Sequence, residues 1–209
     1  MIKAVLFDLD GVVLDTETQY TKFWGKQFRR YYPETSGIEH KIKGMTLVQI
    51  YDAFFADRPD VQEAITHELN EFERQMCFDY IAGFETFVKQ LHQRGLKTAV
   101  VTSSNRPKME GVYVKRPELK QYFDKILTSE DFTKSKPDPE CYLKGAQVLG
   151  VQPAECMGIE DSINGLKAVR AAGLYSVGLT TTNSRQVVAS LCDVVADDFT
   201  QLNLDILLG

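Results

Sequence analysis

The sequence predicts an α/β protein: a doubly wound parallel sheet with a group of helices inserted after the first strand. Three observations favour this architecture. An apolar strand opens the chain, a segment with only helical periodicity follows it, and strand and helix patterns alternate through the remainder. Such alternation is typical of parallel sheets with helices on both faces. We therefore expect residues 1–15 and 82–209 to form the α/β core and residues 16–81 to form the helical insert.

The first expected strand covers residues 4–7, which are apolar throughout, as in strands buried on both faces of a parallel sheet. Two acids, Asp8 and Asp10, follow it, with Gly11 directly behind them. If the strand continued past Phe7, both carboxylates would project together from its C-terminal end, where open α/β sheets bind ligands. Close carboxylates repel each other, which favours a shared proton or a bound cation. An ordinary Asp-Gly turn is the competing interpretation.

The insert is expected to contain three amphipathic helices, each marked by apolar residues at helical spacing. The three stripes are Tyr20, Trp24, Phe28 and Tyr31; Leu47, Ile50, Tyr51, Phe54 and Phe55; and Val61, Ile65, Leu69, Phe72 and Met76. Pro59 and Asp60, with Glu63 three residues after the aspartate, predict the start of the third helix. We expect these stripes to pack against one another, and we do not expect most of their residues to bind a ligand.

From Gly83 onward, strands and helices are expected to alternate. The expected elements, in order, are a helix ending at Gly95, a strand within 96–105, a short strand within 123–132, a helix over 139–149, a strand over 155–161, a helix ending at Gly173, and strands within 175–181 and 192–197. The carboxyl ends of parallel strands lie at one edge of the sheet, so residues far apart in the chain can meet there.

Polar residues follow several of these strands, and their chemistry is complementary. They are Asp8, Asp10, Thr102, Ser103, Ser104, Lys136, Glu160 and Asp161. Each has an ordinary explanation when taken alone, as a helix cap, a solvated lysine or an acidic helix start. Together, two acids, a hydroxyl, a lysine and two further acids fit phosphoryl transfer, which depends on positioning and charge neutralisation.

Composition excludes several classes of protein. The formal net charge of -5 argues against general nucleic-acid binding, and no apolar run approaches the ~20 residues that span a bilayer. The four cysteines show no metal-binding spacing, as expected of thiols in a reducing cytosol. We expect a cytoplasmic protein without an export signal, a monomer or weak dimer, acting on a small molecule.

Four motifs carry a resemblance to a known family. They are DLDGVVLDT, VVTSSN, KSKPDPECY and GIEDSINGLKAVRAAG. The chain resembles the haloacid dehalogenase superfamily of hydrolases, in the branch with a helical cap after the first strand. Within that branch it is similar to β-phosphoglucomutase and the sugar-phosphate phosphatases. The resemblance implies a Rossmann-like core with residues 16–81 as its cap.

The resemblance also implies catalytic roles. Asp8 would be the nucleophile that forms an aspartyl-phosphate, and Asp10 would be the general acid and then the base. An acid at position 10 argues against a haloacid substrate, because a halide leaves without a proton. A Mg²⁺ cofactor would be bound by Asp8, the backbone carbonyl of Asp10, and Asp161. Glu160 would reach the ion directly or through a water molecule.

Thr102, Ser103 and Lys136 would bind the transferred phosphoryl group, and Lys136 would also steady the nucleophile. Lys43 and Gly44 lie between two expected cap helices, where relatives place a loop that faces the active site. Lys43 either contacts a second anionic group of the substrate or is an ordinary solvated lysine.

The resemblance leaves the reaction type open. Mutase relatives carry a histidine where this chain has Tyr20, and an arginine where it has Leu47, Val48 and Gln49. We therefore favour a phosphatase acting on a small metabolite such as a sugar phosphate. The alternatives are a β-phosphoglucomutase-type isomerase and a non-catalytic protein that binds a phosphorylated metabolite.

Overall fold

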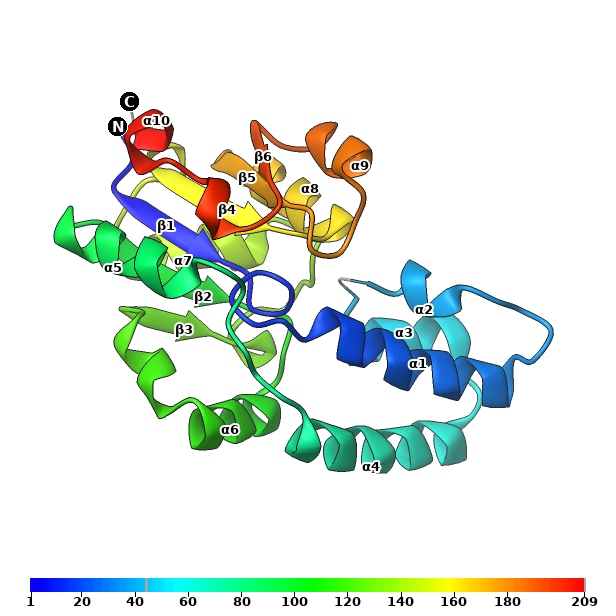
Figure 1. Ribbon diagram of the computed structural model, residues 1–209. Coiled ribbons are helices and arrows are strands. Elements are labelled where there is room, and N and C mark those ends of the chain that lie inside the picture. Colours follow the sequence, from blue (N-terminus) through cyan, green and yellow to red (C-terminus); the bar gives the residue numbers. More distant parts are fainter. Residues whose placement is uncertain (44, 209) are drawn as a thin grey trace.

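The structure, a computed structural model, describes residues 1–43 and 45–208 (Figure 1). Six strands form one sheet in the order β3-β2-β1-β4-β5-β6, and every neighbouring pair is parallel. The strands are β1 (Ala4–Phe7), β2 (Lys97–Val101), β3 (Lys125–Leu127), β4 (Cys156–Glu160), β5 (Tyr175–Leu179) and β6 (Val194–Ala196). This arrangement confirms the predicted doubly wound parallel sheet.

Helices cover both faces of the sheet, as the apolar character of the strands requires. They are α5 (Phe84–Gln93), α6 (Arg106–Lys115), α7 (Glu140–Leu149), α8 (Ile163–Ala171), α9 (Arg185–Ala189) and α10 (Leu204–Leu208). Side chains alternate along β1: Val5 and Phe7 pack with α5 and α6, whereas Ala4 and Leu6 pack with α7 and α8. All four are fully buried, so β1 lies at the centre of the core.

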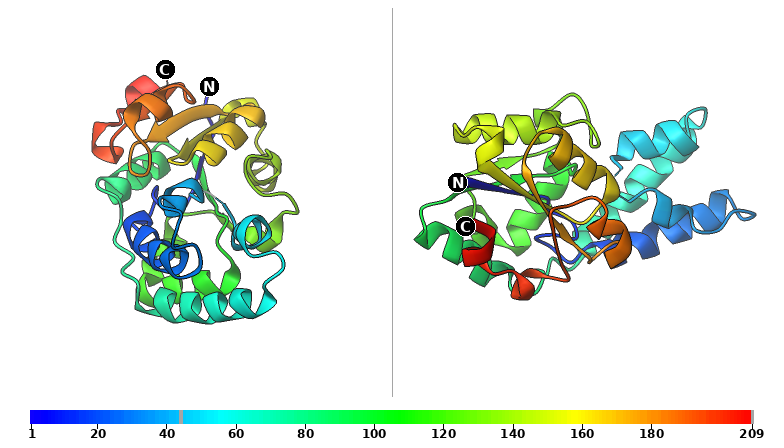
Figure 2. Two further views of the ribbon diagram at one scale, coloured as in Figure 1. Left: turned by 90° about the vertical axis from the view of Figure 1, so that its right-hand side faces the viewer. Right: turned by 90° about the horizontal axis from the view of Figure 1, so that it is seen from above.

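The remaining helices form a separate group beside the carboxyl ends of the strands (Figures 1 and 2). They are α1 (Glu17–Tyr31), α2 (Ile38–Lys41), α3 (Leu47–Phe54) and α4 (Pro59–Gln75). Trp24, Phe28, Phe55 and Ile65 belong to one buried apolar cluster of their own, so the aromatic stripes do pack against one another. The short helix α2 has no counterpart among the predicted elements.

The predicted start of the third insert helix is confirmed, but Asp60 is not its cap. Helix α4 begins at Pro59, and its N-cap is Arg58, which makes no side-chain capping bond. A capping box instead opens α3, where Thr46 and Gln49 exchange side-chain and backbone hydrogen bonds. Asp60 does not cap the helix because Pro59 already occupies the first helical position. The missing N–H of proline costs nothing there, since N–H groups of the first turn have no hydrogen-bond partner within the helix.

Two chain crossings join the helical group to the sheet. Backbone hydrogen bonds link Asp15 to Asp79 and Ile81 to Val13, and Leu14 bridges to both Asp10 and Tyr80. A third contact lies beside them, where Lys115 of α6 donates hydrogen bonds from Nζ to the carbonyl oxygens of two residues at the end of α4. The crossings hold the group over the strand ends, where ligands bind in open α/β sheets.

No helix within the described ranges is both long enough and apolar enough to cross a membrane.

Candidate active site

A cavity of about 500 Å³ lies between the carboxyl ends of the strands and the helical group. We call its two walls the core side and the cap side. The core side includes Asp8, Asp10, Thr102, Ser103, Ser104, Lys108, Lys136 and Asp161. The cap side includes Glu17, Tyr20, Trp24, Glu39, Ile42, Lys43, Met45, Val48, Leu69 and Glu73. Nearly all the residues predicted from the strand ends therefore face one space.

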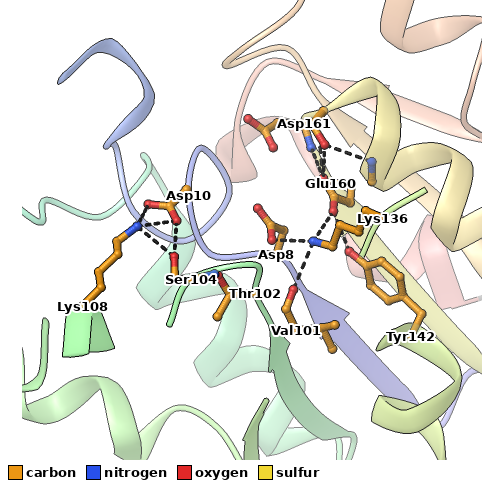
Figure 3. A network of polar contacts seen from close by, with 12 residues as sticks. Asp8, Asp10, Val101, Thr102, Ser104, Lys108, Lys136, Tyr142, Glu160 and Asp161 are labelled. Carbon is orange, nitrogen blue, oxygen red and sulfur yellow. Dashed lines mark hydrogen bonds and ion pairs between the residues drawn. The ribbon is translucent and has the colours of Figure 1, made fainter. Parts of the chain in front are cut away.

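Lys136 joins two strand ends (Figure 3). Its Nζ donates to Asp8 Oδ1 at 2.6 Å, to Glu160 Oε1 at 2.6 Å and to the carbonyl oxygen of Val101 at 3.1 Å. Burial by itself would lower the pKa of Lys136, but the charges of Asp8 and Glu160 outweigh burial and raise it. The lysine is therefore a fixed positive charge beneath Asp8.

Glu160 is fully buried, and all its observed contacts are with protein donors. Oε1 also accepts a hydrogen bond from the Tyr142 hydroxyl at 2.8 Å. Oε2 accepts from the backbone N–H groups of Asp161 at 3.1 Å and Ser162 at 3.3 Å, at the start of α8. A Cβ on Gly165, one turn into that helix, would overlap the Glu160 carboxylate. These contacts fix the acid that holds Lys136.

Three carboxylates, those of Asp8, Glu160 and Asp161, offer oxygen atoms that all lie within 4.8 Å of one another. Burial raises the pKa of Asp8 to about 7 against the opposing charge of Lys136. Burial, followed by the neighbouring carboxylates of Glu17 and Glu160, raises the pKa of Asp161 well above its usual range. A hard divalent cation relieves this repulsion and prefers oxygen ligands, so the donor set fits Mg²⁺.

The backbone at Gly11 makes this close approach possible. Gly11 has a φ of 78°, in the left-handed region, and a Cβ there would overlap the Asp161 carboxylate. The same Asp161 oxygen, Oδ2, accepts a hydrogen bond from the Thr182 hydroxyl. The loop after β1 and the end of β4 therefore meet closely only because residue 11 is a glycine.

Asp10 belongs to a different network from Asp8. Strand β1 ends at Phe7, so the two carboxylates do not project together as a longer strand would require. Asp10 Oδ1 accepts from the Thr16 hydroxyl at 2.5 Å, and Oδ2 accepts from the Ser104 hydroxyl at 2.8 Å. Figure 3 shows Asp10 turned toward Ser104 and Lys108, away from Lys136.

Lys108 of α6 completes the Asp10 network and is not among the residues predicted from the sequence. Its Nζ lies 2.6 Å from each Asp10 carboxylate oxygen and 2.9 Å from Ser104 Oγ. Burial alone would raise the pKa of Asp10, but the charge and hydrogen bonds of Lys108 outweigh burial and lower it. One signal was present: Asn105 is a good N-cap, which places Lys108 in the first turn of a helix directly after a strand-end motif.

The predicted phosphate-binding residues line the cavity beside Asp8. Thr102 is buried, and its Oγ1 accepts a hydrogen bond from the Ser104 N–H at 3.0 Å. Ser103 Oγ is also buried, and no partner for it exists among the described residues. The Lys136 ammonium group at this end of the cavity suits anionic oxygens.

The predicted cap residues lie on the opposite wall. The Tyr20 hydroxyl donates to Glu73 Oε1 at 2.8 Å, and its ring lies 4.6 Å from Lys108 Nζ. Lys43 Nζ is 3.8 Å from Glu17 Oε2 and 3.4 Å from the carbonyl oxygen of Thr182. Gly44 lies outside the described residues.

Comparison with known proteins gives a consistent picture. A family model for haloacid dehalogenase-like hydrolases matches residues 2–173. Validoxylamine A 7'-phosphate phosphatase of Streptomyces hygroscopicus subsp. limoneus is 30% identical over 210 residues, covering 97% of this chain and 96% of that relative. A β-phosphoglucomutase of Bacillus subtilis (strain 168) is 27% identical, covering 85% of this chain and 83% of that relative.

A solved structure shares the fold. It is a family IA, variant 3 hydrolase from Entamoeba histolytica, with a TM-score of 0.84 and 22% identity, covering 98% of this chain and 96% of the other.

Proposed function

Because this chain belongs to the haloacid dehalogenase-like hydrolases, as its motifs indicated, we propose that it is a Mg²⁺-dependent phosphatase of a small phosphorylated metabolite. One observation carries the proposal: Lys136 holds Asp8 and the buried Glu160 at 2.6 Å, and Asp8, Asp10, Lys136 and Asp161 line one cavity. That constellation combines a nucleophile, a cation site and a proton-transfer group. The phosphatase relative supports the same reaction class.

In the first step, Asp8 attacks the phosphorus atom of the substrate. Lys136 holds Oδ1, whereas Oδ2 accepts no hydrogen bond from the described residues and is the oxygen that bonds to phosphorus. The bond from phosphorus to the leaving oxygen breaks, and Asp10 gives that oxygen a proton. Because Lys108 favours the ionised form, Asp10 must take up this proton before the step. The products are an aspartyl-phosphate on Asp8 and a free alcohol.

In the second step, water releases the phosphoryl group. The Asp10 carboxylate, ionised by the first step, takes a proton from a water molecule whose oxygen attacks phosphorus. The bond between phosphorus and Asp8 breaks, and inorganic phosphate leaves. Lys108 stabilises the ionised form of Asp10 that this step requires.

The magnesium site in this proposal uses Asp8, the backbone carbonyl of Asp10, and Asp161. Mg²⁺, when bound, supplies charge neutralisation for the transferring phosphoryl group. Thr102, Ser103 and Lys136 hold the phosphoryl oxygens. Because both Glu160 oxygens already accept hydrogen bonds from protein donors, we propose that Glu160 supports the ion through a water molecule.

Charge pairing in the cavity favours a phosphatase over a mutase. A mutase must hold a bisphosphate and therefore needs cations for two phosphates. Each lysine that lines this cavity already faces a carboxylate: Lys43 faces Glu17, Lys108 faces Asp10, and Lys136 faces Asp8. Arginine is absent from the described residues that line it. We therefore propose that the substrate carries one phosphate on a small, uncharged polyol such as a sugar.

We also propose that residues 16–81 act as the cap that selects this substrate. The group has its own apolar cluster, and only two crossings join it covalently to the sheet. Its cavity wall combines apolar and hydrogen-bonding side chains, including Trp24, Met45 and Glu39. Such a wall suits a leaving group with both apolar faces and hydroxyls.

The test is a panel of phosphorylated metabolites, including glucose 1-phosphate and glucose 6-phosphate, with Mg²⁺ present. Free phosphate and product sugars are measured together, with Asp8→Asn as the control. Phosphate release that disappears in the variant supports the proposal. Interconversion of the glucose phosphates without phosphate release would show a mutase. Tight binding without any turnover would show a binding protein.

A further inference from the structure

We propose that Lys108 is a positioning residue, which orients the carboxylate of Asp10 and links that orientation to the cap through Tyr20. The inference rests on the proposed function, because it assigns the proton transfers to Asp10. It concerns a lysine outside the four motifs that define the site. Lys136 serves Asp8, so each of the two aspartates has its own lysine.

The contacts of Lys108 fix the plane of the Asp10 carboxylate. Nζ reaches both carboxylate oxygens at 2.6 Å, whereas Thr16 and Ser104 reach one oxygen each. The side chain of Lys108 is only 4% exposed and that of Asp10 only 17% exposed. A buried ammonium group needs its partner, so the two side chains constrain each other. Without Lys108, only two neutral hydroxyls would hold Asp10.

The backbone around Lys108 is itself well anchored. Asn105 Oδ1 accepts a hydrogen bond from the Lys108 N–H at 3.0 Å and so caps α6. Ser104 follows the end of β2, and its hydroxyl contacts both Asp10 and Lys108. Lys108 therefore approaches Asp10 from a rigid element of the core. Sites built on such elements hold their side chains more precisely than sites on loops.

A chain of contacts continues from Lys108 into the cap. The Tyr20 ring of α1 lies 4.6 Å from Nζ, within the range of a cation–π interaction. The Tyr20 hydroxyl donates to Glu73 of α4 at 2.8 Å. A cap displaced from this position would remove the aromatic face from Lys108 and loosen Asp10. The proton-transfer group is then fully positioned only when the cap is seated.

The two chemical steps depend on Asp10 to different degrees. With 4-nitrophenyl phosphate, the departing phenolate is stable and leaves without a proton, so formation of the aspartyl-phosphate does not need Asp10. Hydrolysis of that intermediate still needs Asp10 to remove a proton from water. A loosened Asp10 should therefore slow the second step selectively.

The experiment follows 4-nitrophenol release from Lys108→Met in a stopped-flow instrument, with Mg²⁺ present. We expect a burst of about one product per site, as for a covalent intermediate that accumulates. We expect the steady rate after it to be about 10²-fold below wild type, within the usual contribution of general acid–base catalysis. Lys108→Arg should recover part of that rate. Lys144→Met, which removes an exposed lysine of α7, should turn over at the wild-type rate.

A double-mutant cycle separates positioning from direct substrate contact. In an Asp10→Asn background, Lys108→Met should change the steady rate less than about twofold, because interacting sites are not additive. A Lys108 effect that persists in this background would overturn the positioning role. So would a steady rate of Lys108→Met equal to wild type.

Two further variants keep the test decisive. Lys108→Gln, which retains a hydrogen-bond donor, replaces Lys108→Met if circular dichroism shows that the latter is unfolded. Tyr20→Leu should lower the steady rate and retain the burst, and an unchanged rate would refute the link to the cap. A wild-type protein that releases no phosphate in an Asp8-dependent way would instead refute the proposed function.

Discussion

The two walls of the cavity differ in how tightly their charged side chains are held. On the core side, Lys136 and Lys108 contact their carboxylates at 2.6 Å and are almost fully buried. On the cap side, Lys43 lies 3.8 Å from Glu17 and is partly exposed. Fixed groups suit chemistry, which depends on preorganised charge, and loosely held groups suit recognition of a substrate. Changes on the core side should therefore affect turnover, and changes on the cap side should affect binding, except at Tyr20, whose ring contacts Lys108.

The largest effect is expected from Asp8→Asn. The amide cannot form the aspartyl-phosphate, so kcat should fall by at least about 10⁴-fold, as when a nucleophile is removed from other enzymes. Steady-state phosphate release measures the loss. Asp15→Asn is the matched control, because Asp15 is exposed and follows the same loop. A residual kcat close to wild type would reject Asp8 as nucleophile.

The second largest effect is expected from Lys136→Met, which should lower the stability of the protein as well as its activity. The change leaves the carboxylates of Asp8 and Glu160 without their shared cation, and removing one partner of a buried pair costs about 3–5 kcal/mol. Urea unfolding, with the midpoint and slope both fitted, measures the free energy of unfolding. Lys134→Met serves as control, because its ion pair with Asp138 is exposed. Equal losses in the two variants would contradict the buried network.

Gly165→Ala tests the packing beneath Glu160. The new methyl group would overlap the Glu160 carboxylate and displace it from Lys136, at about 1–3 kcal/mol for an overpacked site. Gly111→Ala is the control, because it lies within α6 with no neighbour that a Cβ would meet. That variant should gain up to about 1 kcal/mol from helix propensity. Thermal unfolding of the two variants should show a loss of stability for Gly165→Ala and a gain for Gly111→Ala.

The smallest effect is expected on the cap side, from Lys43→Ala. Partly exposed ion pairs contribute about 0.2–1 kcal/mol, so KM should change by no more than about fivefold while kcat stays near wild type. Substrate titrations on this variant and on Lys41→Ala, which alters an exposed lysine nearby, give the comparison. A large fall in kcat would show that Lys43 takes part in the chemical steps. It would contradict the proposed difference between the core side and the cap side.

Local patterns and motifs were sufficient to predict the sheet and to place several candidate residues at its edge. Alternating strands and helices fix the layers because a parallel sheet must be covered on both faces. The motifs after β1, β2 and β4 then share an edge by topology alone. Lys136 lies on a loop before α7, and its place in the site was predicted from its sequence motif.

The orientation of Asp10 and the role of Lys108 were not predictable in this way. Both depend on where β1 stops and on the contact between α6 and Asp10, which joins residues 98 positions apart in the chain. Helix α2 was missed because four residues are too few to show helical periodicity. Features that depend on tertiary contacts could therefore be identified only from the structure.

The most direct test of the central claim is to locate the phosphoryl group during turnover. The wild-type protein is mixed with Mg²⁺ and an active phosphoester, quenched in acid, digested and analysed by mass spectrometry. We expect the added mass of one phosphoryl group on the peptide that contains Asp8, and its loss in Asp8→Asn. A phosphoryl group on any other residue, or turnover with no phosphorylated protein at any quench time, would contradict it.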